Sequence, residues 1–185
     1  MTVRPKSSRR RSDVRVVDDA PAVQAVETFE NFYERELRSV VGLAYALSGS
    51  RVAAEDLAQE AFLAAHKQWD RISRYEKPSA WVRRVVANMS VSMFRRKMTE
   101  AKALAKMRPE AAYLPELPSE SDDFWRVVRG LPKRQAQTIA LHYLEGRSVR
   151  EISEVIECSP NTVKVHLHKG RKKLADKLGV EGGFS

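Results

Sequence analysis

The sequence predicts an all-α fold, with two small helical domains joined by a flexible linker. Apolar residues recur at i, i+3 and i+4 spacing in both halves of the chain, as in amphipathic helices. Between the halves, residues 107–121 contain three prolines and no apolar periodicity, and such a segment can extend to about 50 Å. We therefore expect helical domains at 26–106 and 122–179, the linker at 107–121, and a short C-terminal tail at 180–185.

Composition limits the partners and the location of the chain. The net charge of +9 favours a polyanionic partner, either nucleic acid or an acidic membrane surface. No apolar run is long enough to span a membrane, and the basic start lacks the apolar core of a signal peptide, so we expect a cytoplasmic protein. The single cysteine, Cys158, allows no internal disulfide and no zinc site of its own, and we expect a neutral thiol.

Residues 1–25 are poor in large apolar groups and rich in Arg, Ser and Asp, which predicts a disordered basic tail. Its arginines either add weak, salt-dependent affinity for DNA or have no specific role. From Glu27 the apolar rhythm predicts a helix that ends at Gly49. Ser50 then suits the N-cap of a second helix, whose apolar side continues to Trp69.

The polar side of this second helix carries Asp56, Gln59 and Glu60, at i, i+3 and i+4 spacing on an otherwise basic protein. Carboxylates near a helix N-terminus stabilise the helix through its macrodipole, so the patch has a purely structural interpretation. It also matches a surface that docks on basic side chains of a partner helix. Both interpretations stay open from the residues alone.

After a polar loop at residues 70–78, Pro78 and Ser79 open a third long helix, which frays after Ala105. Its core stripe is Val82, Val85, Val86, Met89 and Met93. An adjacent face presents Trp81, Arg84, Asn88, Ser92 and Arg95. Arginines beside an amide and an aromatic ring can follow a phosphate backbone and hold an unstacked base. Trp81 is also compatible with a partly buried core position.

The back half begins with a short helix from about Asp122 to Leu131, and Pro132 starts another that Gly146 closes. The residues of this second helix expected to face inward are Ala136, Ile139, Ala140, Tyr143 and Leu144. The next segment, residues 148–178, predicts a helix-turn-helix. Ser148 and Glu151 form a capping box, and Ser159 followed by Pro160 suits the start of the second helix.

The second helix of this unit has two distinct sides. Its apolar residues Val163, Leu167, Leu174 and Leu178 should face the protein. The opposite side carries Asn161, Val165, His168, Lys169 and Lys172, with Thr162 and Lys164 on the flanks, whereas His166 falls nearer the protein. Polar groups near the N-terminus and lysines further along are typical of a DNA recognition helix. A solvated basic face on a helical hairpin is the alternative.

Over residues 29–178 the chain resembles the extracytoplasmic-function sigma factors of the sigma-70 family. The most specific segments are EDLAQEAFLAAHKQWD, from Glu55 to Asp70, and the stretch from Gly130 to Leu174 that contains GLPKRQAQTIALHYLEG and SPNTVKVHLHKGRKKL. The resemblance implies sigma domain two in the first helical domain and sigma domain four in the second. It implies that Asp56, Gln59, Glu60 and Leu63 bind the β′ coiled coil of core RNA polymerase.

The resemblance also implies two sets of DNA contacts. Recognition and melting of the minus-ten element fall on Ser73, Tyr75, Lys77, Trp81, Arg84, Asn88 and Arg95. Contacts to the minus-thirty-five element fall on Thr162, Lys164, Val165, His168 and Lys169. Ser153 stands where the family usually has a small apolar residue, and His166 and His168 replace the more usual arginine or aromatic residues.

The leading function is therefore a specificity subunit that binds core polymerase and directs promoter-specific initiation, with no cofactor or metal and with an anti-sigma factor as a further partner. The alternative is a stand-alone helix-turn-helix regulator of LuxR-like type, because SPNTVKVHLHK resembles those proteins too. The docking patch in the front half distinguishes the two. An enzyme is disfavoured, since the chain has no glycine-rich phosphate loop, metal-ligand cluster or spaced Ser/His/Asp set.

Overall fold

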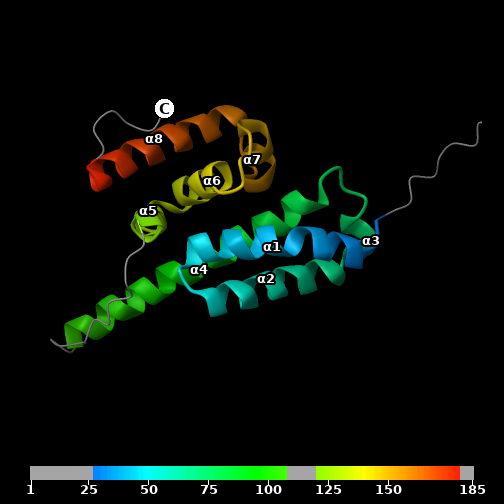
Figure 1. Cartoon of the computed structure of the whole chain (residues 1–185), viewed down its shortest axis with the longest axis horizontal. Coiled ribbons are helices and arrows are strands. Elements are labelled where there is room, and N and C mark those ends of the chain that lie inside the picture. Colours follow the sequence, from blue (N-terminus) through cyan, green and yellow to red (C-terminus); the bar gives the residue numbers. More distant parts are fainter. Residues whose placement is uncertain (1–26, 108–119, 180–185) are drawn as a thin grey trace, which may run out of the picture.

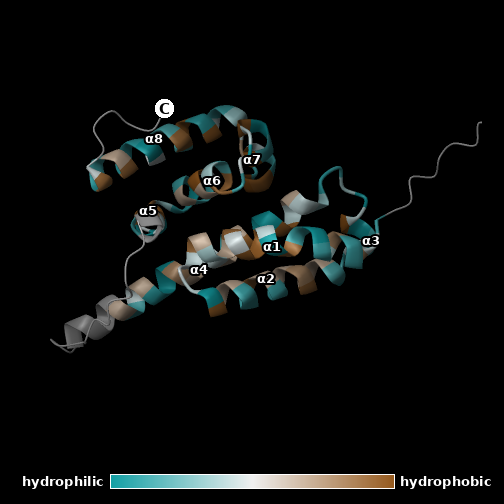
Figure 2. Ribbon diagram, viewed as in Figure 1, coloured by the Kyte–Doolittle hydropathy of each residue, from teal (hydrophilic) through white to brown (hydrophobic). Residues whose placement is uncertain are grey.

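A computed structural model describes residues 27–107 and 120–179, and within these ranges the chain forms eight helices and no strand (Figure 1). The predicted N-terminal tail, most of the predicted linker and the C-terminal tail lie outside the described residues. Helices α1–α4 form the front half and helices α5–α8 form the back half. Apolar and polar positions share each helix, as the brown and teal bands of Figure 2 show.

Helices α1 (Phe29–Ser48) and α2 (Arg51–His66) run antiparallel, joined by a tight turn. Gly49 adopts a left-handed conformation, with φ of 72°, and donates its amide to the Tyr45 carbonyl oxygen, which confirms that it ends α1. The Ser50 side chain accepts a hydrogen bond from the amide of Ala53, as expected of an N-cap.

The helix predicted to run through Trp69 is shorter than expected, because α2 ends at His66 and a separate short helix, α3 (Trp69–Ile72), follows. The prediction of a loop from Asp70 onward is therefore wrong over residues 70–72. Ile72 is fully buried, and the Trp69 indole donates to the Glu27 carbonyl oxygen at 3.2 Å. One isolated apolar residue in a polar stretch produces no periodic signal, although its burial fixes this turn of helix.

The long helix α4 (Pro78–Met107) begins at the predicted proline and projects beyond the rest of the front half (Figure 1). Val82 and Val86 are completely buried, and the remaining predicted stripe residues pack partly buried against the same core. Each buried aliphatic side chain of this kind contributes about 1.5–3 kcal/mol. The stripe therefore fastens α4 to α1 and α2.

The back half contains α5 (Glu120–Arg129), α6 (Lys133–Tyr143), α7 (Val149–Ile156) and α8 (Pro160–Leu178). The predicted capping box is present: Ser148 Oγ accepts from the Glu151 amide at 3.3 Å, and Glu151 Oε2 accepts from the Ser148 amide at 2.9 Å. Ser159 Oγ accepts from the Thr162 amide at 3.1 Å. The structure thus confirms both predicted starts of the helix-turn-helix.

One part of the α6 prediction is wrong. Ala136, Ile139 and Ala140 are fully buried as expected, but Tyr143 and Leu144 are 38% and 42% exposed. Leu141 takes the inward position at this end of the helix and is completely buried. The helix ends at Tyr143, so Tyr143 and Leu144 lie at its very end, where the core covers them only in part.

The two halves pack against each other, with α5, α6 and α7 contacting α1 or α4. A cluster of charged groups lies within this contact, and we call it the Arg83 cluster: Ser39, Glu36, Arg83 and Glu145. Arg83 and Glu145 have side chains only 3% and 4% exposed, and Arg83 Nε donates to Glu145 Oε2 at 2.8 Å. Arg83 also donates to Glu36 Oε2 at 2.7 Å and to Ser39 Oγ at 3.0 Å. The cluster therefore links the loop after α6 to both α1 and α4.

Helices α6 and α8 approach closely at Gly170, where a Cβ atom would lie only 2.9 Å from Ile139 Cγ1. We predict that Gly170→Ala lowers the free energy of unfolding by about 1 kcal/mol, because overpacking of about 1–3 kcal/mol outweighs a gain in helix propensity of about 1 kcal/mol. Urea unfolding followed by circular dichroism measures the change.

Gly42 supplies the matched control, since it lies inside α1 and a Cβ there meets no atom within 4 Å. Gly42→Ala should raise the free energy of unfolding by up to about 1 kcal/mol. Equal shifts of the two variants in the same direction would contradict the packing argument.

Candidate nucleic-acid interface

The predicted recognition helix α8 presents its contact residues outward. Lys164, Val165, His168 and Lys169 are exposed, and Thr162 is half-buried beside the cap, with its Oγ1 at 2.8 Å from Ser159 Oγ. Val163, Leu167 and Leu174 are buried on the opposite side of the helix. The helix-turn-helix core thus fixes which side chains a DNA groove can meet.

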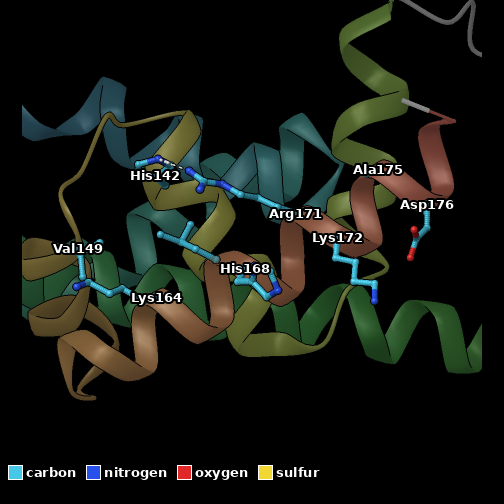
Figure 3. Close-up of a pocket in the computed structure, with 9 residues that line it drawn as sticks. His142, Val149, Lys164, His168, Arg171, Lys172, Ala175 and Asp176 are labelled. Atoms are coloured by element: carbon cyan, nitrogen blue, oxygen red, sulfur yellow. Dashed lines mark hydrogen bonds between the residues drawn. The ribbon is translucent and has the colours of Figure 1, made fainter. Parts of the chain in front are cut away.

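An open hollow of about 500 Å³ runs along this face and extends it beyond the predicted residues (Figure 3). Lys164, His168, Arg171 and Lys172 line it from α8, and His142 lines it from α6. Arg171 Nε donates to the Tyr143 hydroxyl at 2.8 Å, and its Nη2 lies 3.2 Å from His142 Nε2. The guanidinium is therefore held in one orientation. Two further cationic side chains, Lys164 and Lys172, line the same hollow.

Sequence reasoning missed Arg171 and His142. Arg171 follows His168 by three residues, so the helical spacing alone would have placed the two on neighbouring positions of one face. No comparable signal exists for His142, because only the packing of α6 against α8 brings it to the hollow.

His166 turns toward the protein, as the helical periodicity predicted. Its ring is half-buried, and its buried Nδ1 has no hydrogen-bond partner among the described residues. Burial lowers the pKa of His166 below its ordinary value of 6.5, and the nearby charges of Arg134 and Lys169 lower it further. This histidine therefore stays neutral near pH 7, unlike a phosphate-binding cation.

Two other unusual residues of the helix-turn-helix have simple structural roles. Ser153 is buried, and its Oγ donates to the Arg150 carbonyl oxygen at 2.6 Å. The buried hydroxyl group therefore has a hydrogen-bond partner. Cys158 is half-buried in the turn before α8, and burial raises the pKa of its thiol, as expected for a neutral group.

The acidic patch lies on the exposed side of α2. Asp56, Gln59, Glu60 and Leu63 are all exposed, and Leu63 is 60% exposed despite its apolar side chain. Among the described residues, neither Asp56 nor Glu60 has an ion-pair partner. An apolar groove of about 540 Å³ between α1 and α2 adjoins the patch, and its lining residues include Phe29, Tyr33, Gln59, Phe62 and Leu63. The patch thus combines unpaired negative charge with accessible apolar surface.

Four of the predicted minus-ten residues, Tyr75, Lys77, Trp81 and Arg84, line a shallow pocket of about 200 Å³ at the start of α4. Tyr75 accepts a hydrogen bond from Arg71 Nε at 2.8 Å, and Trp81 is half-buried against the core. Ser73 caps the end of α3, and Arg95 is exposed further along α4. Glu154 of α7 completes the lining of the pocket.

The back half occupies several of these side chains, which sequence reasoning did not anticipate. Lys77 Nζ donates to Glu154 Oε2 at 2.7 Å. Arg84 Nε donates to the Val155 carbonyl oxygen at 3.1 Å. Further along α4, Asn88 Oδ1 accepts from Gln137 Nε2 at 2.9 Å. Three predicted minus-ten residues are thus bound to α6 and α7.

Comparison with known families matches both halves. The family profile "Sigma-70 region 2" matches residues 32–99, and "Sigma-70, region 4" matches residues 121–174. The chain therefore belongs to the sigma-70 family of RNA polymerase sigma factors. Because a region 2 match accounts for the front half, the LuxR-like alternative is not favoured.

Individual relatives narrow the assignment. The chain is 28% identical over 151 residues to the ECF RNA polymerase sigma factor SigW of Bacillus subtilis, covering 74% of this chain and 81% of that one. It is 28% identical over 182 residues to the ECF RNA polymerase sigma factor SigE of Mycolicibacterium smegmatis, and the match covers 88% of this chain and 66% of that one. It is an extracytoplasmic-function sigma factor, and it directs RNA polymerase to promoters.

A solved structure supports the fold. The sigma factor RpoE from Bartonella quintana, crystallised in complex with the anti-sigma factor NepR, superposes with a TM-score of 0.63 at 23% identity, covering 83% of this chain and 98% of that one. None of the described helices is long and apolar enough to cross a membrane. The same residues contain no group of three or more His, Cys, Asp and Glu side chains that could hold a metal ion.

The environment of His166 predicts a pH effect on stability. Because its pKa is lower in the folded state than in the unfolded state, His166 favours the folded state above pH 6.5, and this contribution is lost as the pH falls below that value. Nuclear magnetic resonance should show the His166 Cε1 proton titrating below pH 6.5. In a His166→Gln variant, the free energy of unfolding should depend less on pH between 7 and 5. A His166 midpoint at or above 6.5 would contradict this.

Proposed function

We propose that three separate surfaces divide the work of this sigma factor: α2 docks on core polymerase, the start of α4 holds the melted minus-ten element, and α8 reads the minus-thirty-five element. In this proposal, residues 26–106 act as sigma domain two, residues 122–179 act as sigma domain four, and residues 107–121 link them. The observation that carries the proposal is the unpaired acidic patch of Asp56 and Glu60, exposed on a protein of net charge +9.

The docking surface fits a basic helix with apolar residues on one side. Asp56, Gln59 and Glu60 offer carboxylate and amide oxygens along one side of α2, while Leu63 and the adjoining groove accept apolar side chains. Opposite charges steer the encounter, and a central apolar contact holds it. The β′ coiled coil of polymerase is the proposed partner helix.

The minus-ten surface combines cations, an amide and aromatic rings. Lys77 and Arg84 provide charge for phosphates, Asn88 provides an amide for a base edge, and Tyr75 with Trp81 provides ring faces for stacking. Arg95 extends the positive surface along α4. Stacking and phosphate contacts to a single strand offset the cost of unpairing the duplex, a few kcal/mol per base.

For the minus-thirty-five element, Thr162, Lys164 and Val165 lie in the first turns of α8 and can enter the major groove. His168 and Lys169 follow one turn later, and Arg171 and Lys172 extend the charge toward flanking phosphates. Phosphate contacts set the register, and the groove contacts set the sequence preference.

This proposal needs no catalytic group from the chain, and sigma factors in general are not enzymes. The work of an RNA polymerase subunit places the protein in the cytoplasm. An anti-sigma factor is a further proposed partner, on the precedent of the Bartonella quintana RpoE complex with NepR. Such a regulator would have to cover the α2 patch or one of the DNA surfaces.

Run-off transcription with purified bacterial core polymerase and a pool of genomic fragments tests the proposal and identifies the promoters. We predict that Asp56→Lys/Glu60→Lys weakens binding to core polymerase by at least tenfold, because each substitution places like charges against a basic partner. Run-off product should be lost in parallel.

The control is Glu100→Lys/Asp123→Lys, which makes the same charge change at exposed positions of α4 and α5. It should bind core polymerase as the unsubstituted chain does. Unchanged polymerase binding by the α2 variant would instead favour a stand-alone regulator.

Variants of α8 should separate phosphate contacts from base contacts. Lys172→Ala should weaken binding to all duplexes by a similar factor and reduce the slope of log K against log salt by about one. Lys164→Ala should instead weaken the free energy of binding by about 1–3 kcal/mol, and only for duplexes recovered from the run-off selection. Fluorescence anisotropy with selected and scrambled duplexes measures both. Identical behaviour of the two variants would contradict the assignment of roles.

A further inference from the structure

We propose that an open hollow of about 960 Å³ between α4, α5 and α8 is a binding site for a nucleoside polyphosphate. We call it the Arg126 hollow. Its lining residues include Phe94, Arg95 and Met98 of α4, Arg126 and Arg129 of α5, and Lys173 of α8. The site does not depend on the proposed docking on polymerase, and it shares only Arg95 with the proposed minus-ten surface.

The first support is the concentration of positive charge. Four cationic side chains line the hollow, and none of its lining residues in the described ranges is acidic. Arg126 is paired with Asp123 of its own helix, and Arg129 Nη1 donates to a backbone carbonyl oxygen near the end of α1 at 3.2 Å. Among the described residues, neither Arg95 nor Lys173 has an ion-pair partner. The hollow therefore offers two uncompensated cations beside two arginines that already have partners.

The second support is the repulsion between like charges at the edge of the hollow. Lys133 directly follows Pro132, which is one of the lining residues. Burial lowers the pKa of the Lys133 amine, and the charges of Arg134 and Arg95 lower it further. Arg95 of α4 and Lys133 of α6 thus repel each other across the contact between the two halves. An anion bound in the hollow would offset this repulsion, and phosphate groups are favoured partners of arginine.

The third support is the apolar surface beside the cations. Phe94 is half-buried, Met98 is 43% exposed, and both line the hollow together with Leu131. The turn at Gly49 closes one side, and a Cβ atom there would lie only 2.9 Å from Arg129 Nε, so this wall is closely packed. A base can stack on an aromatic ring. A nucleotide therefore has both parts that the lining requires, a flat base and charged phosphates.

The size of the hollow favours a small molecule over a nucleic acid. Ligand sites in proteins typically measure about 300–1,000 Å³, and the Arg126 hollow falls within this range. A DNA strand would need a positive groove that continues past the site. The adjoining hollow of about 250 Å³ contains Lys177 but also the Asp176 carboxylate, which would repel a continuing strand. Because both halves line the Arg126 hollow, a bound nucleotide would also stabilise their described arrangement.

Isothermal titration calorimetry of the full-length chain with GTP tests the proposal. Arg126→Ala/Lys173→Ala should weaken GTP binding by about tenfold or more, because it removes two of the cations that face the phosphates. The matched control is Arg51→Ala/Lys67→Ala, which also removes one ion-paired arginine and one lysine at exposed positions. The control should change the affinity by less than about twofold. Circular dichroism checks that both variants remain folded.

A third variant separates the base from the phosphates. Phe94→Leu keeps an apolar side chain but removes the aromatic ring. It should weaken GTP binding by about fivefold and leave the binding of inorganic triphosphate unchanged, because only GTP has a base to stack. Absence of GTP binding by the unsubstituted chain, or an equal effect of Phe94→Leu on both ligands, would overturn the proposal.

Duplex DNA is the alternative occupant of the hollow. If Arg126→Ala/Lys173→Ala weakened binding of a random-sequence duplex 20-mer but left GTP binding unchanged, the nucleotide site would be ruled out. Equal losses of GTP affinity in this variant and in its control would have the same meaning. Polymerase-dependent run-off by the unsubstituted chain decides the proposed function separately, because it does not depend on GTP binding to this chain.

Discussion

The arrangement of the two halves depends on the burial of Arg83. A guanidinium excluded from water needs anionic partners, because an uncompensated buried charge costs several kcal/mol. Glu36 on α1 and Glu145 after α6 meet this need from opposite halves. Burial alone would raise the pKa of Glu36, but hydrogen bonds and charges of Arg83 and Arg35 hold it below its ordinary value. The ion pairs therefore persist, and they set where α7 lies on α4.

The sequence was sufficient to predict structural features that depend on neighbouring residues, such as the ends of helices. Gly49, Ser50, Ser148 and Ser159 act as helix caps through groups within a few residues of them, so their pattern predicted each helix end. Features with distant causes were not predictable. Ile72 and Tyr143 were misplaced because only tertiary packing decides their burial.

The same distinction explains which parts of the candidate site escaped sequence reasoning. Spacing along α8 placed the exposed contact residues, including Lys164 and His168, on the outward side. By contrast, Arg83 and Arg84 are adjacent arginines that look equivalent in sequence, although one is 3% exposed and the other reaches α7. Nothing local distinguishes them, because their partners outside α4 lie more than 40 residues away.

This division between neighbouring arginines separates a buried contact between the halves from a more exposed one. Removing a partner from a buried charge costs about 3–5 kcal/mol, whereas an exposed pair is worth about 0.2–1 kcal/mol. Lys77 and Arg84 can therefore leave α7 at modest cost. In the proposed minus-ten role, phosphates would replace carboxylates around the same cations, so the electrostatic gain would be smaller than for free cations.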